Sequence, residues 1–287
     1  MLKLLALDLD GTLLNSSGEI PKKNLEAIRQ AEKHGVLVTI ATGRRFRDAR
    51  PVALQLELNA PLISHNGALL KYAHNLKTVA ASLVPQEIVR EILRVGREFG
   101  GDALLSCDPH GKGVLLYDRV SDENIPLQKY IAWSKRLHGD EAEEAVHHVE
   151  NLEDVLEKTE TVHVSFSGNC VPMSELEKVL QDELKNSATI LTTVYPLLDF
   201  TLIDILPSDA SKGIGVEKLA LLNKFSAENV MAIGDNFNDL EMRKYAGTAV
   251  VMGNASPELL EREDFHITLS NDENGVALAI EEFILGA

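Results

Sequence analysis

Short apolar runs alternate with helical patterns at both ends of this 287-residue chain, and this alternation constrains the fold more than any other feature. Residues 4–9 form an almost unbroken apolar run, a helical pattern follows Pro21, and residues 36–40 form a second apolar run. An unbroken apolar run is typical of a strand covered on both faces, as in a parallel sheet. The order strand, helix, strand therefore predicts a right-handed βαβ unit.

The C-terminal part continues the same alternation. Helical patterns cover residues 212–224, 239–245, 256–262 and 274–284, and apolar strand patterns cover 230–233, 249–252 and 265–269. Helices that alternate with buried strands are typical of a doubly wound, Rossmann-like α/β fold with a parallel sheet.

The middle of the chain has a different pattern. We expect helices at residues 86–99, 127–137 and 174–184, and strands at 103–107, 114–117, 162–167, 189–194 and 200–206. Several of these strands follow one another without a helix between them, which indicates an antiparallel or mixed sheet. We therefore predict a discontinuous core domain, residues 1–83 and 208–287, and an inserted α+β domain, residues 84–207.

Composition excludes several kinds of partner. Apolar residues make up 45% of the chain, which suits a globular protein, and the formal net charge is −16. An acidic chain is a poor partner for nucleic acid or for an anionic membrane surface, because both are recognised through basic residues. The only cysteines, Cys107 and Cys170, fit neither a zinc spacing nor a disulfide framework. No apolar run is long enough for a signal core or a membrane span, so a cytoplasmic location is expected.

Polar residues at the ends of the predicted strands are the candidates for a site, because open α/β sheets bind ligands there. Asp8 and Asp10 follow the first strand, and their spacing projects both carboxylates to the same side. Carboxylates at the end of an apolar run need a metal or hydrogen bonds to offset their desolvation. This pair alone also fits an ordinary turn.

Three other strand or helix ends carry groups that suit an anion or a metal. Thr42 and Gly43 offer a hydroxyl and a main-chain N–H group after the second strand. Lys212 opens a predicted helix, where a cation is unusual unless an anion lies in front of it. Asp235 and Asp239 follow the apolar run at 230–233. Each feature alone fits a cap or a surface position, but their order along the chain is distinctive.

Together, these motifs resemble the haloacid dehalogenase-like phosphatases. They are most similar to the Cof-type hydrolases, in which a large α/β cap lies between the second and third motifs. The segments that carry the resemblance are Asp8–Leu14, Ala41–Arg44, Asn66–Ala68, Ser211–Gly213, Gly234–Asp239, Val251–Ala255 and Asn271–Ala277. The resemblance spans the whole predicted core and is diffuse across the insert.

The resemblance implies a phosphoric monoester hydrolase that acts on a small phosphorylated metabolite. Asp8 is the expected nucleophile and forms an aspartyl-phosphate. Asp10 is the expected general acid, which protonates the leaving group and then activates water. The expected cofactor is Mg²⁺, held by the Asp8 carboxylate, the Asp10 main-chain carbonyl and Asp235.

The remaining site residues are also expected from the resemblance. Asp239 should orient Lys212 or the waters of the metal. The groups that should bind the phosphoryl oxygens are the main-chain N–H groups of Leu9 and Gly43 and the side chains of Thr42, Lys212 and Asn238. Arg44 and Asn66 are possible contacts for the substrate.

A basic cluster of four arginines, Arg44, Arg45, Arg47 and Arg50, follows the second strand. The cluster could bind a second anionic group of the substrate. For all but Arg44, an ordinary solvated helix face is the favoured interpretation.

Two other functions stay open. A phosphotransferase or phosphomutase would use the same aspartates and Mg²⁺ but would transfer the phosphoryl group to an alcohol. A signalling phosphoacceptor of the receiver type also combines an aspartate, an acidic pair, a threonine and a lysine in a doubly wound sheet. Such domains usually place the acceptor after a central strand, whereas Asp8 follows the first strand and has Asp10 beside it.

Overall fold

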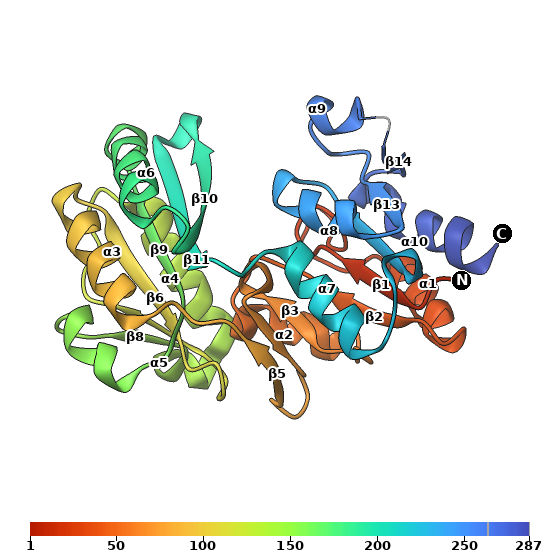
Figure 1. Ribbon diagram of the computed structural model, residues 1–287, viewed down its shortest axis with the longest axis horizontal. Helices are drawn as coiled ribbons and strands as arrows, with labels where there is room; N and C mark the ends of the chain where they lie inside the picture. The colour runs from red at the N-terminus through yellow and green to blue at the C-terminus, as the bar shows by residue number, and fades with distance from the viewer. Residues whose placement is uncertain (263, 287) are drawn as a thin grey trace. The chain divides into compact units, whose positions relative to one another are not determined.

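The chain forms two compact units. The computed structural model describes residues 1–262 and 264–286 (Figure 1). Unit 1 comprises Met1–Arg44, Ala49–Val79 and Ser211–Ala287, and unit 2 comprises Arg45–Asp48 and Ala80–Ala210. Residues 45–48 belong to unit 2, where Arg45 bonds to Tyr130 and Ser134 and Arg47 bonds to the Gly113 carbonyl.

Unit 1 is built on a five-stranded parallel sheet with the order β14-β13-β12-β1-β2. From β1 the chain proceeds outward to β2, and later from β12 outward on the other side, so the strand order reverses between β1 and β12. Ligands of open α/β sheets bind at such a switch point. The strands are β1 (Leu4–Leu7), β2 (Leu37–Ile40), β12 (Val230–Gly234), β13 (Thr248–Val251) and β14 (His266–Ile267).

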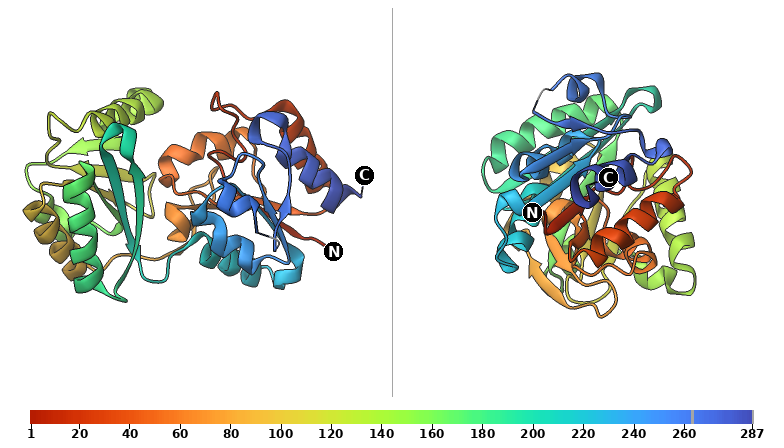
Figure 2. Two further views of the ribbon diagram at one scale, coloured as in Figure 1. Left: turned by 90° about the horizontal axis from the view of Figure 1, so that it is seen from above. Right: turned by 90° about the vertical axis from the view of Figure 1, so that its right-hand side faces the viewer.

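Helices cover both faces of this sheet. Helix α1 lies beside α10, and α7 lies beside α8 on the other face (Figures 1 and 2). The bounds are α1 (Lys22–Lys33), α2 (Phe46–Gln55), α7 (Lys212–Leu222), α8 (Leu240–Tyr245), α9 (Pro257–Leu260) and α10 (Gly275–Ile280). In the described part of the chain, no helix is long and apolar enough to cross a membrane.

A small second sheet, which the sequence patterns did not predict as a unit, follows β2. It consists of β3 (Leu62–Ser64), β4 (Leu69–Lys71) and β5 (Thr78–Ala81), and a parallel bridge between Ala41 and Ile63 connects it to the end of β2. Its strands of three or four residues are too short to give a clear alternation in the sequence.

Strand β1 shows why its sequence is apolar throughout. All four residues from Leu4 to Leu7 are fully buried, because β2 and β12 flank the strand and helices cover both faces. The strand ends at Leu7, two residues earlier than predicted. The Asp8 N–H still bonds to the Ile233 carbonyl, and the chain then turns through Gly11, whose φ of 78° favours glycine. Because the strand ends at Leu7, Asp8 lies just beyond the carboxyl end of β1.

Unit 2 contains a six-stranded mixed sheet with the order β10-β11-β9-β6-β7-β8. All neighbouring strands are antiparallel except β7 and β8. The strands are β6 (Asp102–Cys107), β7 (Val114–Tyr117), β8 (Val146–His148), β9 (Thr161–Gly168), β10 (Ala188–Tyr195) and β11 (Phe200–Pro207). The helices are α3 (Gln86–Glu98), α4 (Ile125–His138), α5 (Ala142–Ala145) and α6 (Cys170–Leu184).

Two apolar clusters hold unit 2 together. Leu105 of β6 packs in a large cluster with residues of α3 and α6, whereas the adjacent Leu104 packs in a smaller cluster with Leu127 and Ile131 of α4. Neighbouring residues of a strand point to opposite faces. Helices therefore cover both faces of this sheet near β6.

Three of the four arginines of the basic cluster do not form a solvated helix face, so the favoured interpretation is wrong for them. Arg45 and Arg47 are each only 6% exposed and belong to unit 2. Arg45 is paired with Asp48, Arg47 with Glu141, and the partly buried Arg50 donates to the Ala73 carbonyl. Most of these partners lie far along the chain, so a local pattern of basic residues does not reveal the burial.

Candidate active site

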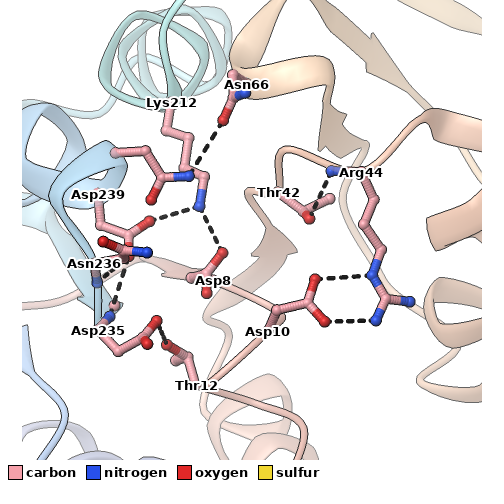
Figure 3. A network of polar contacts seen from close by, with 12 residues as sticks. Asp8, Asp10, Thr12, Thr42, Arg44, Asn66, Lys212, Asp235, Asn236 and Asp239 are labelled. Atoms are coloured by element: carbon pink, nitrogen blue, oxygen red, sulfur yellow. Dashed lines mark hydrogen bonds and ion pairs between the residues drawn. The ribbon is translucent and has the colours of Figure 1, made fainter. Parts of the chain in front are cut away.

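Asp8 and Lys212 form the centre of the site in unit 1. Asp8 is the first residue after β1, and Lys212 is the first residue of α7, which Ser211 caps by accepting from the Ile214 N–H. Lys212 Nζ donates to Asp8 Oδ1 and to Asp239 Oδ1, each at 2.6 Å (Figure 3). Both side chains are almost completely buried. The predicted proximity of Asp8 and Lys212 is therefore present in the structure.

Gly67 allows the loop that follows β3 to approach the start of α7. A Cβ at this position would lie 1.9 Å from the Ser211 carbonyl oxygen, and the φ of Gly67 is 95°. A side chain there would displace the helix end that carries Lys212. This close approach gives a physical reason for the Asn66–Ala68 motif.

The loop after β12 supplies two more carboxylates. Asp239 Oδ2 accepts from the N–H groups of Asp235 and Asn236 at 3.1 and 3.0 Å, so Asp239 holds this loop and Lys212 at once. Asp235 Oδ1 accepts from the Thr12 hydroxyl at 3.2 Å, which ties Asp235 to the loop after β1 (Figure 3). Asp239 thus connects this loop to Lys212, and Asp235 connects it to the loop after β1.

The carboxylates can supply a site for a hard divalent cation. One oxygen each from Asp8, Asp235 and Asp239 lie within 4.8 Å of one another, and oxygen ligands are those that Mg²⁺ prefers. Gly11 makes room for this arrangement, because a Cβ there would lie 2.4 Å from Asp235 Oδ2. Asp239 is already engaged by three donors, so Asp8 and Asp235 are the better candidates to hold Mg²⁺.

The electrostatics of the cluster show an excess of negative charge. Burial raises the pKa of Asp8 to about 8; the positive charge of Lys212 opposes this shift, and Asp239 adds to it. Burial and the charge of Asp239 also raise the pKa of Asp235. Burial alone would lower the pKa of Lys212, but Asp239 and Asp8 outweigh it and raise that pKa. Lys212 thus remains charged, and Lys212 and the buried Arg243 together bring two positive charges to three carboxylates.

Some of the groups expected to bind the phosphoryl oxygens or the substrate lie next to one another. The Asn66 side chain lies against Gly43, where a Cβ would be 3.2 Å from both amide atoms of Asn66. Asn66 N–H donates to the Thr42 carbonyl at 3.0 Å, and Asn238 Nδ2 lies 3.5 Å from Asn66 Oδ1. The structure therefore brings Thr42, Gly43, Asn66 and Asn238 together. Leu9, the remaining predicted member, is buried directly after Asp8.

Asp10 and Arg44 are paired with each other. Arg44 Nε donates to Asp10 Oδ2 at 2.8 Å, and Arg44 Nη2 donates to Asp10 Oδ1 at 2.5 Å. Asp8 and Asp10, two residues apart, therefore have different partners and different environments (Figure 3). The Asp10 side chain is 56% exposed, whereas that of Asp8 is 6% exposed.

Three residues that the sequence did not assign to the site brace it. Thr12 binds Asp235, as described above. Asn254 Nδ2 donates to the Gly11 carbonyl at 2.8 Å, which ties the C-terminal segment to the loop after β1. Arg243, 1% exposed, donates to the carbonyls of Gly234 and Asn236 on either side of Asp235. The segment 251–255 was part of the resemblance and signalled Asn254, but no local pattern signalled a buried Arg243.

Comparison with known proteins places the chain in a family. A family model described as haloacid dehalogenase-like hydrolase matches residues 5–280. The chain is 32% identical to the Bacillus subtilis 5-amino-6-(5-phospho-D-ribitylamino)uracil phosphatase YwtE, over 99% of each chain. It is 26% identical to the HMP-PP phosphatase of Serratia proteamaculans, over 90% of this chain and 86% of that protein.

Solved structures agree with this placement. A haloacid dehalogenase-like hydrolase from Bacteroides thetaiotaomicron superposes with a TM-score of 0.81 at 25% identity, covering 99% of this chain and 100% of the other. A Thermotoga maritima structure has a TM-score of 0.80 at 24% identity and covers 99% and 98% of the two chains, which shows the fold. As its motifs indicated, the chain belongs to the haloacid dehalogenase-like hydrolases and resembles their Cof-type members.

Proposed function

We propose that this protein is a Mg²⁺-dependent phosphatase that hydrolyses a small phosphorylated metabolite through an aspartyl-phosphate on Asp8. The observation that carries the proposal is the position of Asp8. Lys212 holds its Oδ1, and among residues 1–262 and 264–286 no hydrogen-bond donor contacts its Oδ2. A buried carboxylate with one oxygen fixed and the other open to a ligand suits a nucleophile.

The proposed reaction has two steps. In the first, Asp8 Oδ2 attacks phosphorus, the bond to the ester oxygen breaks, and Asp10 gives a proton to that oxygen. In the second, Asp10 takes a proton from water, the water oxygen attacks phosphorus, and the bond to Asp8 breaks to release phosphate and free Asp8. Lys212 contacts Asp8, and Asn66 contacts both Thr42 and Asn238, which supports the proposal that Lys212, Thr42 and Asn238 stabilise charge on the phosphoryl oxygens.

The excess negative charge around Asp8 supports the proposed Mg²⁺ requirement. Asp8 and Asp235 would hold the ion, with the Asp10 carbonyl as the third expected ligand. Bound Mg²⁺ supplies positive charge that lets an anionic nucleophile meet an anionic ester. Within the chain itself, Lys212 keeps Asp8 oriented, and Asp239 keeps both Lys212 and the Asp235 loop in place.

The names of the relatives suggest where to look for the substrate. YwtE is named for a phosphorylated ribitylamino-uracil, and the Serratia protein is named for HMP-PP. We therefore propose a metabolite phosphate of this size, such as a sugar or ribityl phosphate, as the substrate of this chain. We also propose that unit 2 acts as the cap domain that selects the leaving group.

The test is phosphate release from a panel of metabolite phosphates, including sugar phosphates and the ribitylamino-uracil phosphate. Release should require Mg²⁺, stop in chelator, and be absent in Asp8→Asn. Acid quenching of a single turnover should trap a phosphoprotein in the wild type and none in that variant. Phosphate transfer to an added alcohol, in place of release, would favour the phosphotransferase. A stable phosphoprotein without turnover would favour the phosphoacceptor.

A further inference from the structure

Arg44 was expected to contact the substrate, but in the structure its side chain is paired with Asp10. The guanidinium contacts both carboxylate oxygens, at 2.8 Å through Nε and 2.5 Å through Nη2 (Figure 3). A two-point contact of this kind fixes the plane and direction of a carboxylate, which a single-point contact cannot do.

Both partners are anchored through their main chains. The Arg44 N–H donates to the Thr42 hydroxyl at 3.1 Å, and the Arg44 carbonyl accepts from the His65 N–H at 3.0 Å. On the other side, Asp10 forms an isolated bridge with Leu14. Arg44 lies in the loop after β2, and Asp10 lies in the loop after β1. These two strands are neighbours, so the guanidinium of Arg44 connects two loops that are each fixed by main-chain contacts. This anchoring sets the direction of the Asp10 side chain.

The direction matters because Asp8 and Asp10 have separate tasks in the proposed function, on which this inference rests. Asp8 must face phosphorus, whereas an acid–base group must face the departing oxygen in the in-line position. The structure holds Asp8 toward Lys212 and Asp10 toward Arg44 (Figure 3). We propose that Arg44 is a positioning residue for Asp10, which acts on catalysis through the orientation of that carboxylate and not as a contact for the substrate.

Two observations support this assignment. The side chains of Arg44 and Asp10 are 25% and 56% exposed, and ion pairs of that exposure add little to folding stability. In addition, the other arginines of the basic cluster bind elsewhere, Arg45 to Asp48, Arg47 to Glu141 and Arg50 to the Ala73 carbonyl. Arg44 alone among them reaches Asp10, and the pair is not required to hold the fold together.

The test is a double-mutant cycle on kcat and KM with Mg²⁺ and a substrate found in the release screen. Arg44→Ala should lower kcat by roughly 10- to 100-fold, a part of the contribution typical of acid–base catalysis, and leave KM within about twofold. Asp10→Asn should lower kcat further, and the double variant should be no slower than Asp10→Asn alone. Arg50→Ala, a change in the same basic cluster without contact to Asp10, is the matched control and should keep wild-type kinetics.

Chemical rescue separates orientation from a general structural effect. Added guanidinium should restore part of kcat in Arg44→Ala but none in the Arg44→Ala/Asp10→Asn double variant. Arg44→Lys keeps the charge but lacks the fork, so it should remain well below the wild type.

The outcomes that would overturn the role of Arg44 differ from those that would refute the proposed phosphatase function. Multiplicative losses in the cycle, or a loss that appears mainly in KM, would overturn the inference and restore Arg44 as a substrate contact. Rescue that persists in the Asp10→Asn background would also overturn it. A wild type without phosphatase activity, or activity that Asp8→Asn leaves unchanged, would instead refute the proposed function and this inference with it.

Discussion

Two clusters of buried charge, one in each unit, differ in whether their charges balance. In the Asp48 cluster of unit 2, one carboxylate meets one guanidinium, since Arg45 Nε and Nη2 contact the two oxygens of Asp48. The hydroxyls of Tyr130 and Ser134 and the ring of His138 occupy the remaining positions around Asp48. The charge and the hydrogen-bonding capacity of Asp48 are therefore met by side chains of the protein itself.

The Lys212 cluster of unit 1, formed by Asp8, Asp235, Asp239 and Lys212, lacks that balance. Its carboxylates outnumber its lysine, and burial raises the pKa of both Asp8 and Asp235. At Asp48, by contrast, burial alone would raise the pKa, but the hydrogen bond with His138 and the charge of Arg45 outweigh it and lower the pKa well below its usual range. The Asp48 cluster is therefore complete without a ligand, whereas the Lys212 cluster retains the excess of negative charge that supports the proposed Mg²⁺ site.

The largest expected effect is on activity in the Lys212 cluster. Asp8→Asn should lower kcat by about 10³-fold or more, which corresponds to ~4 kcal/mol of activation free energy, because it removes the proposed nucleophile. The amide oxygen can still accept from Lys212, so circular dichroism should show an intact fold. Phosphate release at the wild-type rate would contradict the assignment of Asp8.

The next largest effect should be on stability in the Asp48 cluster. Asp48→Ala leaves the 6%-exposed guanidinium of Arg45 without its counter-ion, which should cost about 3–5 kcal/mol of unfolding free energy. Urea unfolding measures this as a lower midpoint. The control is Asp264→Ala, which breaks an exposed pair with Arg262 and should leave the midpoint unchanged. Equal midpoints for the two variants would show that the buried Arg45–Asp48 pair contributes no more to stability than the exposed Arg262–Asp264 pair.

Mg²⁺ should stabilise the folded protein by binding at the Lys212 cluster. At a hundred times its dissociation constant, the ion should add about 2.7 kcal/mol to the unfolding free energy of the wild type and nothing in Asp235→Asn. In chelator, Asp235→Asn should be at least as stable as the wild type. A raised pKa means that the folded protein favours the neutral form, which asparagine imitates. Thermal melts of both proteins, with Mg²⁺ and with chelator, test this, and a Mg²⁺ response retained in Asp235→Asn would count against the site.

The pH dependence of stability should follow the balanced cluster. Because the folded pKa of Asp48 is lowered, its pairing contributes fully above the unfolded value of 3.8 and is lost as the pH falls toward the folded value. The difference in unfolding free energy between the wild type and Asp48→Asn should therefore shrink by up to about 1.4 kcal/mol for each pH unit below 3.8. Urea titrations from about pH 6 down to about pH 2 measure this difference, and a gap that stays constant below pH 3.8 would contradict the pairing.

The smallest predicted effect concerns the brace between the C-terminal segment and the loop after β1. Asn254→Ala removes the hydrogen bonds with the Gly11 carbonyl and the Asn271 N–H, each ~1 kcal/mol. We expect a small decrease in the thermal midpoint together with a few-fold loss of kcat. Unchanged kcat would show that the loop keeps its position without this brace.

The sequence predicted the core strands and the main site residues for the same physical reason. Strands such as β1 and β12 are buried on both faces, so their apolar runs are visible without knowledge of the partner strands. The polar residues directly after them, such as Asp8 and Asp235, then stand out. Their convergence followed from the rule that parallel strands present their carboxyl ends at one edge.

The parts that the sequence did not predict depend on partners far along the chain. Arg45 is buried because Tyr130 and Ser134 meet it, and Arg243 is buried because it reaches two carbonyls of the loop around Asp235. A basic residue on a helix gives the same local pattern whether such partners exist or not. The partnership of Arg44 with Asp10 was hidden for the same reason, since it joins two separate loops.

The position of β1 between β2 and β12 has a consequence for the order in which the protein is made. β2 leaves the ribosome soon after β1, whereas β12 begins at Val230, and Lys212 is 204 residues from Asp8. Until β12 has been made, one edge of β1 therefore lacks its neighbour, and an unpaired apolar edge invites wrong pairings. The nascent chain thus presents Asp8 204 residues before Lys212, and it cannot assemble the Lys212 cluster until Asp235 and Asp239 have also been made.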